Sequence, residues 1–300
     1  MSRSHRPQTT RPAFNPSLAL VSGVLAVSTG SIFARLADAP ALVIAAYRVG
    51  LASLILAPVA CWRCRAELLS LEVKDYLLAV LAGLCLALHF GTWISSLDYT
   101  AVANSVVLVN TNPLWVGLFT PFVTGERLSL TMKVGIFMSV VGGAIIGMGD
   151  FATGTTALWG DFLALLGSVF AAFYLLLGRA LRRKLSLLAY VILCYGSAAI
   201  ILWLLILSLQ LPITGYSDKT WAAFVGMALV SQIIGHSSYN WALKWFSTSL
   251  IAVSLLGEPI GATIMAYIIF DEGLSWTKYV GGIMILSAIY LAGRGEQASE

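Results

Sequence analysis

Charged residues are scarce in this sequence, and their scarcity excludes most soluble proteins. Only 11% of the 300 residues are Asp, Glu, Lys or Arg, whereas 59% are hydrophobic. A soluble domain has about 25% charged residues, because polar side chains must cover its surface. The composition therefore excludes a water-soluble enzyme. The net charge of +4 is also too small to indicate a nucleic-acid partner.

Cysteine is rare as well, with four residues in the chain. Cys85 and Cys194 lie inside apolar runs, while Cys61 and Cys64 form a CxxC pair without a second pair of ligands. This spacing predicts neither a disulfide framework nor a zinc or redox site. We interpret the thiols as small apolar side chains and expect no metal and no cofactor.

Long apolar runs, in contrast, fill most of the chain. A membrane-crossing helix needs about 20 predominantly apolar residues, and ten such segments can be drawn with short connections between them. The predicted spans are 17–35, 41–61, 76–97, 101–123, 131–148, 158–178, 187–208, 220–242, 247–270 and 276–293. We therefore predict an all-α membrane protein with ten transmembrane helices and no room for an extramembrane domain.

The distribution of Lys and Arg gives an orientation to these spans. With the N-terminus in the cytoplasm, 14 of the 18 basic residues fall on the cytoplasmic side, three fall outside and Arg48 lies within a span. Basic residues are enriched in cytoplasmic loops. We expect a multi-pass protein of the bacterial inner (plasma) membrane, with both termini in the cytoplasm.

An internal repeat divides the chain into two units of five spans. At an offset of 146 residues, the segment 107–149 shows 11 identities with the second half, and the first span matches the sixth at an offset of 137. We delimit a cytoplasmic tail at 1–16, a first repeat at 17–149 and a second repeat at 157–295. The change of offset predicts about nine extra residues in the second half, which we place within 209–219.

An odd number of spans in each repeat forces the second repeat to enter the membrane upside down. Inverted repeats are a signature of secondary transporters, because two pseudo-symmetric halves can exchange inward-open and outward-open shapes. The sequence therefore predicts a carrier that works by alternating access.

The repeat also carries a family resemblance. Each unit ends in a span with a proline, a step such as Glu126-x-Leu128-Ser129, and a glycine-containing span, and Gly160-Asp161 opens the sixth span. Over 18–294 this pattern resembles the EamA family of the drug/metabolite transporter superfamily. The resemblance implies transport of small metabolites, often export, with amino-acid exporters among the family's members. One departure is Thr29-Gly30-Ser31, where the family often carries a Trp-Gly-Ser-like step.

Two matched positions at mid-membrane depth combine a polar residue with a proline. Asn112 precedes Pro113, and its repeat mate Glu258 precedes Pro259. Proline removes a backbone donor and frees the carbonyl four residues earlier, so we predict hinges at both prolines. Glu258 is expected either to bind a substrate amine or a proton, or to be a buried neutral acid that bonds a neighbouring helix.

Arg48 lies about eight residues from the outer end of the second span. It is a candidate anchor for a substrate carboxylate. The alternative, which we favour, is a structural arginine that snorkels to the interface or binds carbonyls at helix ends. A pairing of Arg48 with Glu258 is left open.

Polar and aromatic residues share faces on several other spans. The remaining candidate substrate-binding residues are His89, Trp93, Trp115, Tyr174, Tyr239 and Asn240. Trp93 and Tyr239 are repeat mates, which favours a shared role in lining a cavity. Each histidine of the spans has two interpretations, as a proton relay or as a hydrogen-bonded packing residue.

Small-residue steps occur on the fifth and tenth spans, for example at Gly135, Gly142 and Gly281. Such steps allow close helix packing in lipid, so we expect packing or dimer surfaces here, and either a monomer or a homodimer. The expected partners are a small-molecule substrate and membrane lipid, with proton coupling left open.

Three other functions compete with the amino-acid carrier. The first is an exporter of drugs or other hydrophobic compounds, which an aromatic cavity with few charges would also suit. The second is an intramembrane enzyme, which would need a catalytic set at one depth. The third is a receptor or scaffold, for which an inverted repeat has no purpose.

Overall fold

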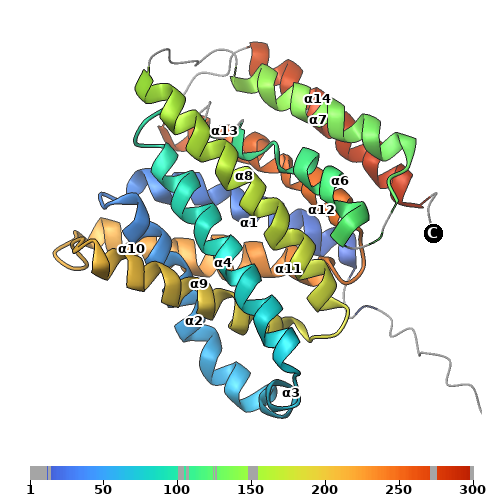
Figure 1. The fold of residues 1–300 in the computed structure, drawn as a ribbon. Helices are drawn as coiled ribbons and strands as arrows, with labels where there is room; N and C mark the ends of the chain where they lie inside the picture. The colour runs from blue at the N-terminus through green and yellow to red at the C-terminus, as the bar shows by residue number, and fades with distance from the viewer. Residues whose placement is uncertain are drawn as a thin grey trace, which may run out of the picture.

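The fold is known from a computed structural model that describes residues 12, 15–100, 105, 108–123, 125, 127–147, 155–270 and 276–297. Every regular element in this part of the chain is a helix (Figure 1). The predicted all-α architecture is therefore confirmed for the described residues.

The helices follow the predicted apolar segments in order. Their bounds are α1 Pro16–Leu36, α2 Ala41–Arg63, α3 Arg65–Leu69, α4 Val73–Ser96, α6 Asn112–Val123, α7 Leu130–Gly147, α8 Thr155–Arg182, α9 Leu187–Ser208, α10 Asp218–Gly226, η1 Met227–His236, α11 Ser237–Ala242, α12 Thr248–Leu255, α13 Gly257–Phe270 and α14 Trp276–Gln297. The short helix α3 lies between the second and third predicted spans. Part of the predicted fourth span, at 101–104 and 106–107, lies outside the described residues.

Six helical stretches of the described chain are long and apolar enough to cross a membrane. They are Pro16–Leu36, Ala41–Arg63, Val73–Ser96, Thr156–Arg182, Leu187–Ser208 and Thr248–Ile269. Two shorter apolar helices cover Leu130–Ile145 and Tyr279–Gly295, which overlap the fifth and tenth predicted spans. The chain is thus built as a multi-pass membrane protein, while the count of ten spans stays a prediction.

Two predicted spans are interrupted helices. The eighth is made of α10, the π-helical segment η1 and α11, and the ninth changes from α12 to α13 at Leu256. A π-helix is rare and usually only one turn long, whereas η1 has ten residues. These interruptions lie in the middle of the bundle, next to the cavity described below.

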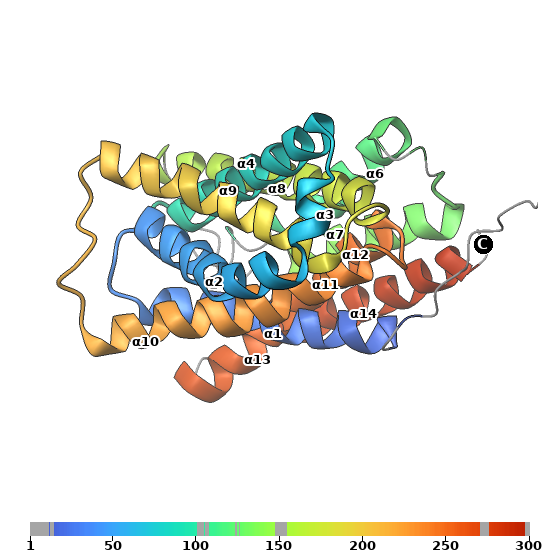
Figure 2. The same ribbon diagram turned by 90° about the horizontal axis from the view of Figure 1, so that it is seen from below.

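The packing of the helices is symmetric under exchange of the two halves. Two pairs of repeat mates contact each other, namely α2 with α9 and α7 with α14, and the fourth span contacts the ninth through α6 and α12 (Figures 1 and 2). Contacts between helices that are not repeat mates also follow the symmetry. Helix α4 packs on α8, and the equivalent contact with the two halves exchanged is that of η1 and α11 with α1. This pattern is what two repeats related by a pseudo-two-fold axis require.

The α7–α14 pair lies at one edge of the bundle (Figure 1). A Cβ atom at Gly142 would lie 2.9 Å from the carbonyl oxygen of Gly281, so these backbones are too close for a side chain. Gly135 likewise faces the backbone of Ala288. The small-residue steps therefore serve packing within the chain, as predicted.

The extra residues of the second half lie in α8 and not in 209–219, so that prediction was wrong. Helix α8 has 28 residues, whereas its mate α1 has 21. The added turns carry Arg179 and Arg182, and the Arg182 Nε donates to the backbone oxygen of Asn240 over 3.0 Å. A helix can grow by whole turns without a change in sequence character, which is why hydropathy placed the insertion wrongly.

Polar contacts join the two halves where α8 ends and α9 begins. Lys184 Nζ donates to Asp75 Oδ1 over 3.0 Å, and this hydrogen bond raises the pKa of Lys184. The backbone N–H of Ser186 donates to Glu67 Oε1 over 2.6 Å. The loop after α8 is thus tied to α3 and to the start of α4.

Candidate functional site

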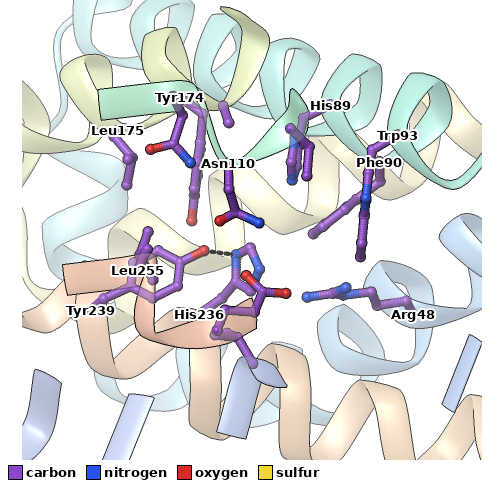
Figure 3. A pocket seen from close by; sticks show the side chains of 15 residues that line it. Arg48, His89, Phe90, Trp93, Asn110, Tyr174, Leu175, His236, Tyr239 and Leu255 are labelled. Carbon is purple, nitrogen blue, oxygen red and sulfur yellow. Dashed lines mark hydrogen bonds between the residues drawn. The ribbon is translucent and has the colours of Figure 1, made fainter. Parts of the chain in front are cut away.

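A small cavity of about 50 Å³ lies between the two repeats (Figure 3). Residues of α1, α2, α4, α6, α8, η1, α11, α12 and α13 line it, together with the turn before α6. The lining residues are Val27, Arg48, His89, Phe90, Trp93, Val109, Asn110, Asn112, Ala171, Tyr174, Leu175, His236, Tyr239, Leu255 and Glu258. Both repeats thus contribute to one cavity.

The repeat mates in this lining locate the cavity on the pseudo-two-fold axis. Four pairs at the offset of 146 residues contribute both members. They are Phe90 with His236, Trp93 with Tyr239, Val109 with Leu255, and Asn112 with Glu258. Equivalent residues of two related units can meet at one point only near their symmetry axis. In inverted-repeat transporters the substrate site lies at the repeat interface.

Arg48 belongs to this cavity and does not reach the membrane interface. Its side chain is 2% exposed. The Nε group donates to Gln232 Oε1 over 2.7 Å, and Cζ lies 4.0 Å from the centroid of the Phe90 ring. Arg48 is therefore not the snorkelling arginine that we favoured from the sequence. A side-chain amide and an aromatic face hold it instead. Figure 3 shows its guanidinium directed into the cavity.

Glu258 lines the same cavity, in the first turn of α13. The preceding helix α12 ends at Leu255, so the carboxylate lies at the N-terminus of a new helix, where a negative charge is stabilised. Within the described residues Glu258 makes no hydrogen bond and no salt bridge. A cation, Arg48, and an acid therefore face one small space, and neither is neutralised by a direct ion pair.

The two histidines of the cavity are held differently. His89 Nδ1 lies 2.9 Å from the backbone oxygen of Gly167, and because a carbonyl only accepts, Nδ1 carries the proton and Nε2 is free to accept. His236 Nδ1 is hydrogen-bonded to the Tyr239 hydroxyl. His236 also packs against its repeat mate Phe90, with ring centroids 5.2 Å apart.

Two lining residues bring buried polar atoms without a partner. Trp93 Nε1 and Asn112 Oδ1 are buried and make no hydrogen bond within the described part of the chain. An unpaired buried polar atom is costly. One donor and one acceptor are thus available to a bound molecule.

Two of the residues predicted for the site do not line the cavity. Trp115 packs against the main hydrophobic core. Asn240 lies behind the cavity wall, where its Nδ2 donates to the hydroxyls of Tyr174 and Tyr195 over 2.5 and 3.0 Å. Asn240 therefore supports Tyr174, which itself lines the cavity.

Pro113 and Pro259, the predicted hinges, each follow a break in a helix. Helix α6 begins at Asn112, directly after a turn at Asn110 and Thr111. Helix α13 begins at Gly257, directly after α12 ends. Proline suits the first helical turn, where its missing N–H would have no partner. Each of these two breaks lies beside the cavity, since Asn112 and Glu258 line it.

Phe90 and Asn110 line the cavity but were not among the predicted site residues, and His236 was predicted only as a proton relay or a packing residue. A signal for two of them was present in the sequence, because Phe90 and His236 are repeat mates one turn from the matched aromatics Trp93 and Tyr239. Asn110 lies in a non-helical turn between α4 and α6. Hydropathy does not predict this turn, because it indicates one continuous helix over the fourth span.

Comparisons with known proteins agree with this architecture. The model of the EamA-like transporter family matches residues 16–148 and 158–294. An uncharacterized transporter of Archaeoglobus fulgidus is 26% identical over 220 residues, which cover 71% of this chain and 74% of the relative. The uncharacterized transporter YyaM of Bacillus subtilis is 21% identical over 202 residues, or 65% and 66% of the two chains.

A protein of known crystal structure has the same fold. It superposes with a TM-score of 0.77 and 18% identity, over 95% of this chain and 98% of the other. The family match covers both repeats, and it agrees with the multi-pass helices and the cavity between symmetric halves. The chain therefore belongs to the EamA-like transporter family and is a membrane transporter.

Proposed function

We propose that this transporter carries a small zwitterion, with amino acids that have apolar side chains as the first candidates. The observation that carries the proposal is the pairing of Arg48 and Glu258 in one cavity with aromatic walls. A free amino acid presents a carboxylate, an ammonium group and a side chain. The cavity offers a group of complementary character for each.

The charged ends of the substrate are assigned to these two residues. Arg48 binds the carboxylate, because a guanidinium presents parallel N–H groups that match two carboxylate oxygens. Glu258 accepts hydrogen bonds from the ammonium group. Trp93, Tyr174 and Phe90 enclose the apolar side chain, and an aromatic face also tolerates the positive charge.

Binding requires the cavity to widen. Ligand sites have volumes of about 300–1,000 Å³, whereas this cavity of about 50 Å³ has room for a few water molecules. The helix breaks before Pro113 and Pro259 are where each repeat bends. Opening alternately toward the two sides of the membrane then moves the substrate across.

The orientation and direction of transport form part of the same proposal. The uneven distribution of basic residues between the two sides of the predicted spans supports cytoplasmic termini and a location in the inner membrane of a bacterial cell. The transporter acts as an exporter and not as an enzyme, either as a monomer or as a homodimer. Protons are the candidate coupling ion, with Glu258 as their carrier.

Transport by the purified protein in liposomes tests the substrate class. Labelled phenylalanine and leucine should move down their gradients faster than in protein-free liposomes. Phenylalaninamide, which lacks the carboxylate, and N-acetylphenylalanine, which lacks the charged amine, should compete at least about tenfold less well, since each lacks one charged hydrogen bond. If both analogues competed as well as phenylalanine itself, that result would contradict the zwitterion site.

Export of hydrophobic compounds is the second candidate, favoured by the aromatic share of the lining. Ethidium added to the same liposomes separates the two functions. Movement of ethidium without movement of either amino acid would establish this candidate and remove the first.

A further inference from the structure

Arg48 is held by residues of two other helices and lies close to a third. Gln232 of η1 accepts the hydrogen bond from Nε, and the Phe90 ring of α4 lies under the guanidinium plane. On the side of α1, a Cβ atom at Gly30 would lie 3.6 Å from Nη1. The terminal N–H groups make no hydrogen bond within the described residues. The part of the guanidinium that remains free is the part that faces the cavity.

Apart from its hydrogen bond to Arg48, the amide of Gln232 makes no contact, among the residues that the structure describes, that would favour a polar side chain at this position. Its side chain is fully buried, and its Nε2 group has no hydrogen-bond partner in the described part of the chain. An unpaired buried amide destabilises a fold, so packing alone would favour an apolar residue here. Its repeat mate is Leu86, which is equally buried and belongs to the hydrophobic core. The amide is therefore specific to the half that faces Arg48.

The segment around Gln232 is itself anchored. The neighbouring Ser231 shares a hydrogen bond of 2.9 Å with Thr29 of α1. Ser231, which bonds Thr29, and Gln232, which bonds Arg48, are consecutive residues of the π-helical segment η1. The hydrogen bond to Thr29 therefore holds η1 against α1 at the point where Gln232 meets α2, and π-helical turns often occur at functional sites.

We propose that Gln232 is a positioning residue that holds the Arg48 guanidinium with its free edge toward the cavity, and so makes the transporter select substrates with a carboxylate. The inference rests on the proposed zwitterion site. A neutral acceptor is the important feature. An amide oxygen orients Nε without cancelling the positive charge, whereas a carboxylate at this position would pair with the guanidinium and compete with the substrate.

Two variants of nearly equal side-chain length test this role in liposomes. Gln232→Met removes the acceptor, and we expect the KM for phenylalanine to rise about tenfold with Vmax changed less than about twofold, because one hydrogen bond to a charged group is lost. Gln232→Glu keeps the hydrogen bond and so keeps the fold. We expect it to reduce the preference for phenylalanine over phenylalaninamide at least about tenfold, by neutralising Arg48.

Leu86→Met is the matched control, because it changes the symmetry-related buried position, which is outside the cavity lining. It should keep the wild-type KM and the wild-type preference for a carboxylate. Wild-type selectivity in Gln232→Glu would overturn the proposal, since a purely structural amide tolerates an acidic replacement that still bonds Arg48. An equal loss of selectivity in Leu86→Met would also overturn it. Failure of the wild-type protein to carry any amino acid would instead refute the proposed function itself.

Discussion

Replacing Glu258 by Gln removes one negative charge from the cavity and changes little else. The two side chains have nearly the same size, and both can accept a hydrogen bond. Glu258 makes no salt bridge within the described residues, so no ion partner is stranded by direct contact. The change therefore separates the role of the charge from that of packing.

The expected effect on substrate affinity follows from the contact that is lost. A hydrogen bond between charged groups contributes about 1.5–3 kcal/mol, and about 1.4 kcal/mol corresponds to a tenfold change in affinity. The KM for phenylalanine should rise about 10- to 150-fold. Competition by N-acetylphenylalanine, which has no ammonium group, should stay the same or improve, because Arg48 then lacks a nearby acid. The loss of charge at the start of α13 should cost less than about 1 kcal/mol of stability.

The measurement is the initial rate of transport in liposomes between pH 5 and 8 for the wild type and the variant. If Glu258 carries protons, the wild-type rate depends on pH and the variant loses that part of the dependence, because an amide does not titrate. The other ionisable or charged groups at the cavity are Arg48, His89, His236, Tyr174 and Tyr239. Any dependence that they cause remains in the variant.

Asp98→Asn provides the control, because it removes an acid from the loop after α4, outside the cavity lining. It should leave both the KM and the pH profile unchanged. A Glu258→Gln variant with the wild-type KM and the wild-type pH profile would refute both the substrate-binding and the proton-carrying role of Glu258. The acid would then be a structural feature of α13.

Three further predictions concern the hinges, the packing and the topology. Pro113→Ala or Pro259→Ala should lower turnover several-fold while binding of phenylalanine, measured by tryptophan fluorescence, stays intact; unchanged turnover in both would leave the prolines as packing features. Gly142→Val should destabilise the α7–α14 pair by about 1–3 kcal/mol, seen as a lower melting temperature, and an unchanged melting temperature would contradict the close contact with the opposite backbone. A reporter fused after Gly295 should be cytoplasmic and one inserted at 152–156 external, and an external C-terminus would exclude the ten-span topology.

Hydropathy and self-comparison were sufficient to predict the class of protein. Apolar runs of about 20 residues have few structural solutions other than membrane helices, because backbone groups in lipid must be hydrogen-bonded within the segment. The repeat offset of 146 residues then paired Trp93 with Tyr239 and Asn112 with Glu258, and both pairs meet at the cavity. Symmetry carried this information, since residues at equivalent positions must converge where two related units meet.

The partners of individual side chains could not be predicted in this way. Arg48 bonds Gln232 across 184 positions of sequence, and nothing in the local pattern of either helix indicates the other. Asn240 and Trp115 share helix faces with cavity residues, yet one supports Tyr174 from behind and the other packs in the core. A helical face spans a wide angle, so periodicity does not decide which of its residues reaches the centre.

The sequence by itself determined the helical membrane class, the two repeats and the family, because these depend on composition, on spacing and on identities along the chain. Tertiary structure decided where the extra residues of α8 lie, that the eighth span is π-helical over Met227–His236, and that Arg48 and Glu258 share one cavity. These features depend on how helices from different parts of the chain approach each other. That approach is set by side-chain packing at many contacts together, and no single segment encodes it.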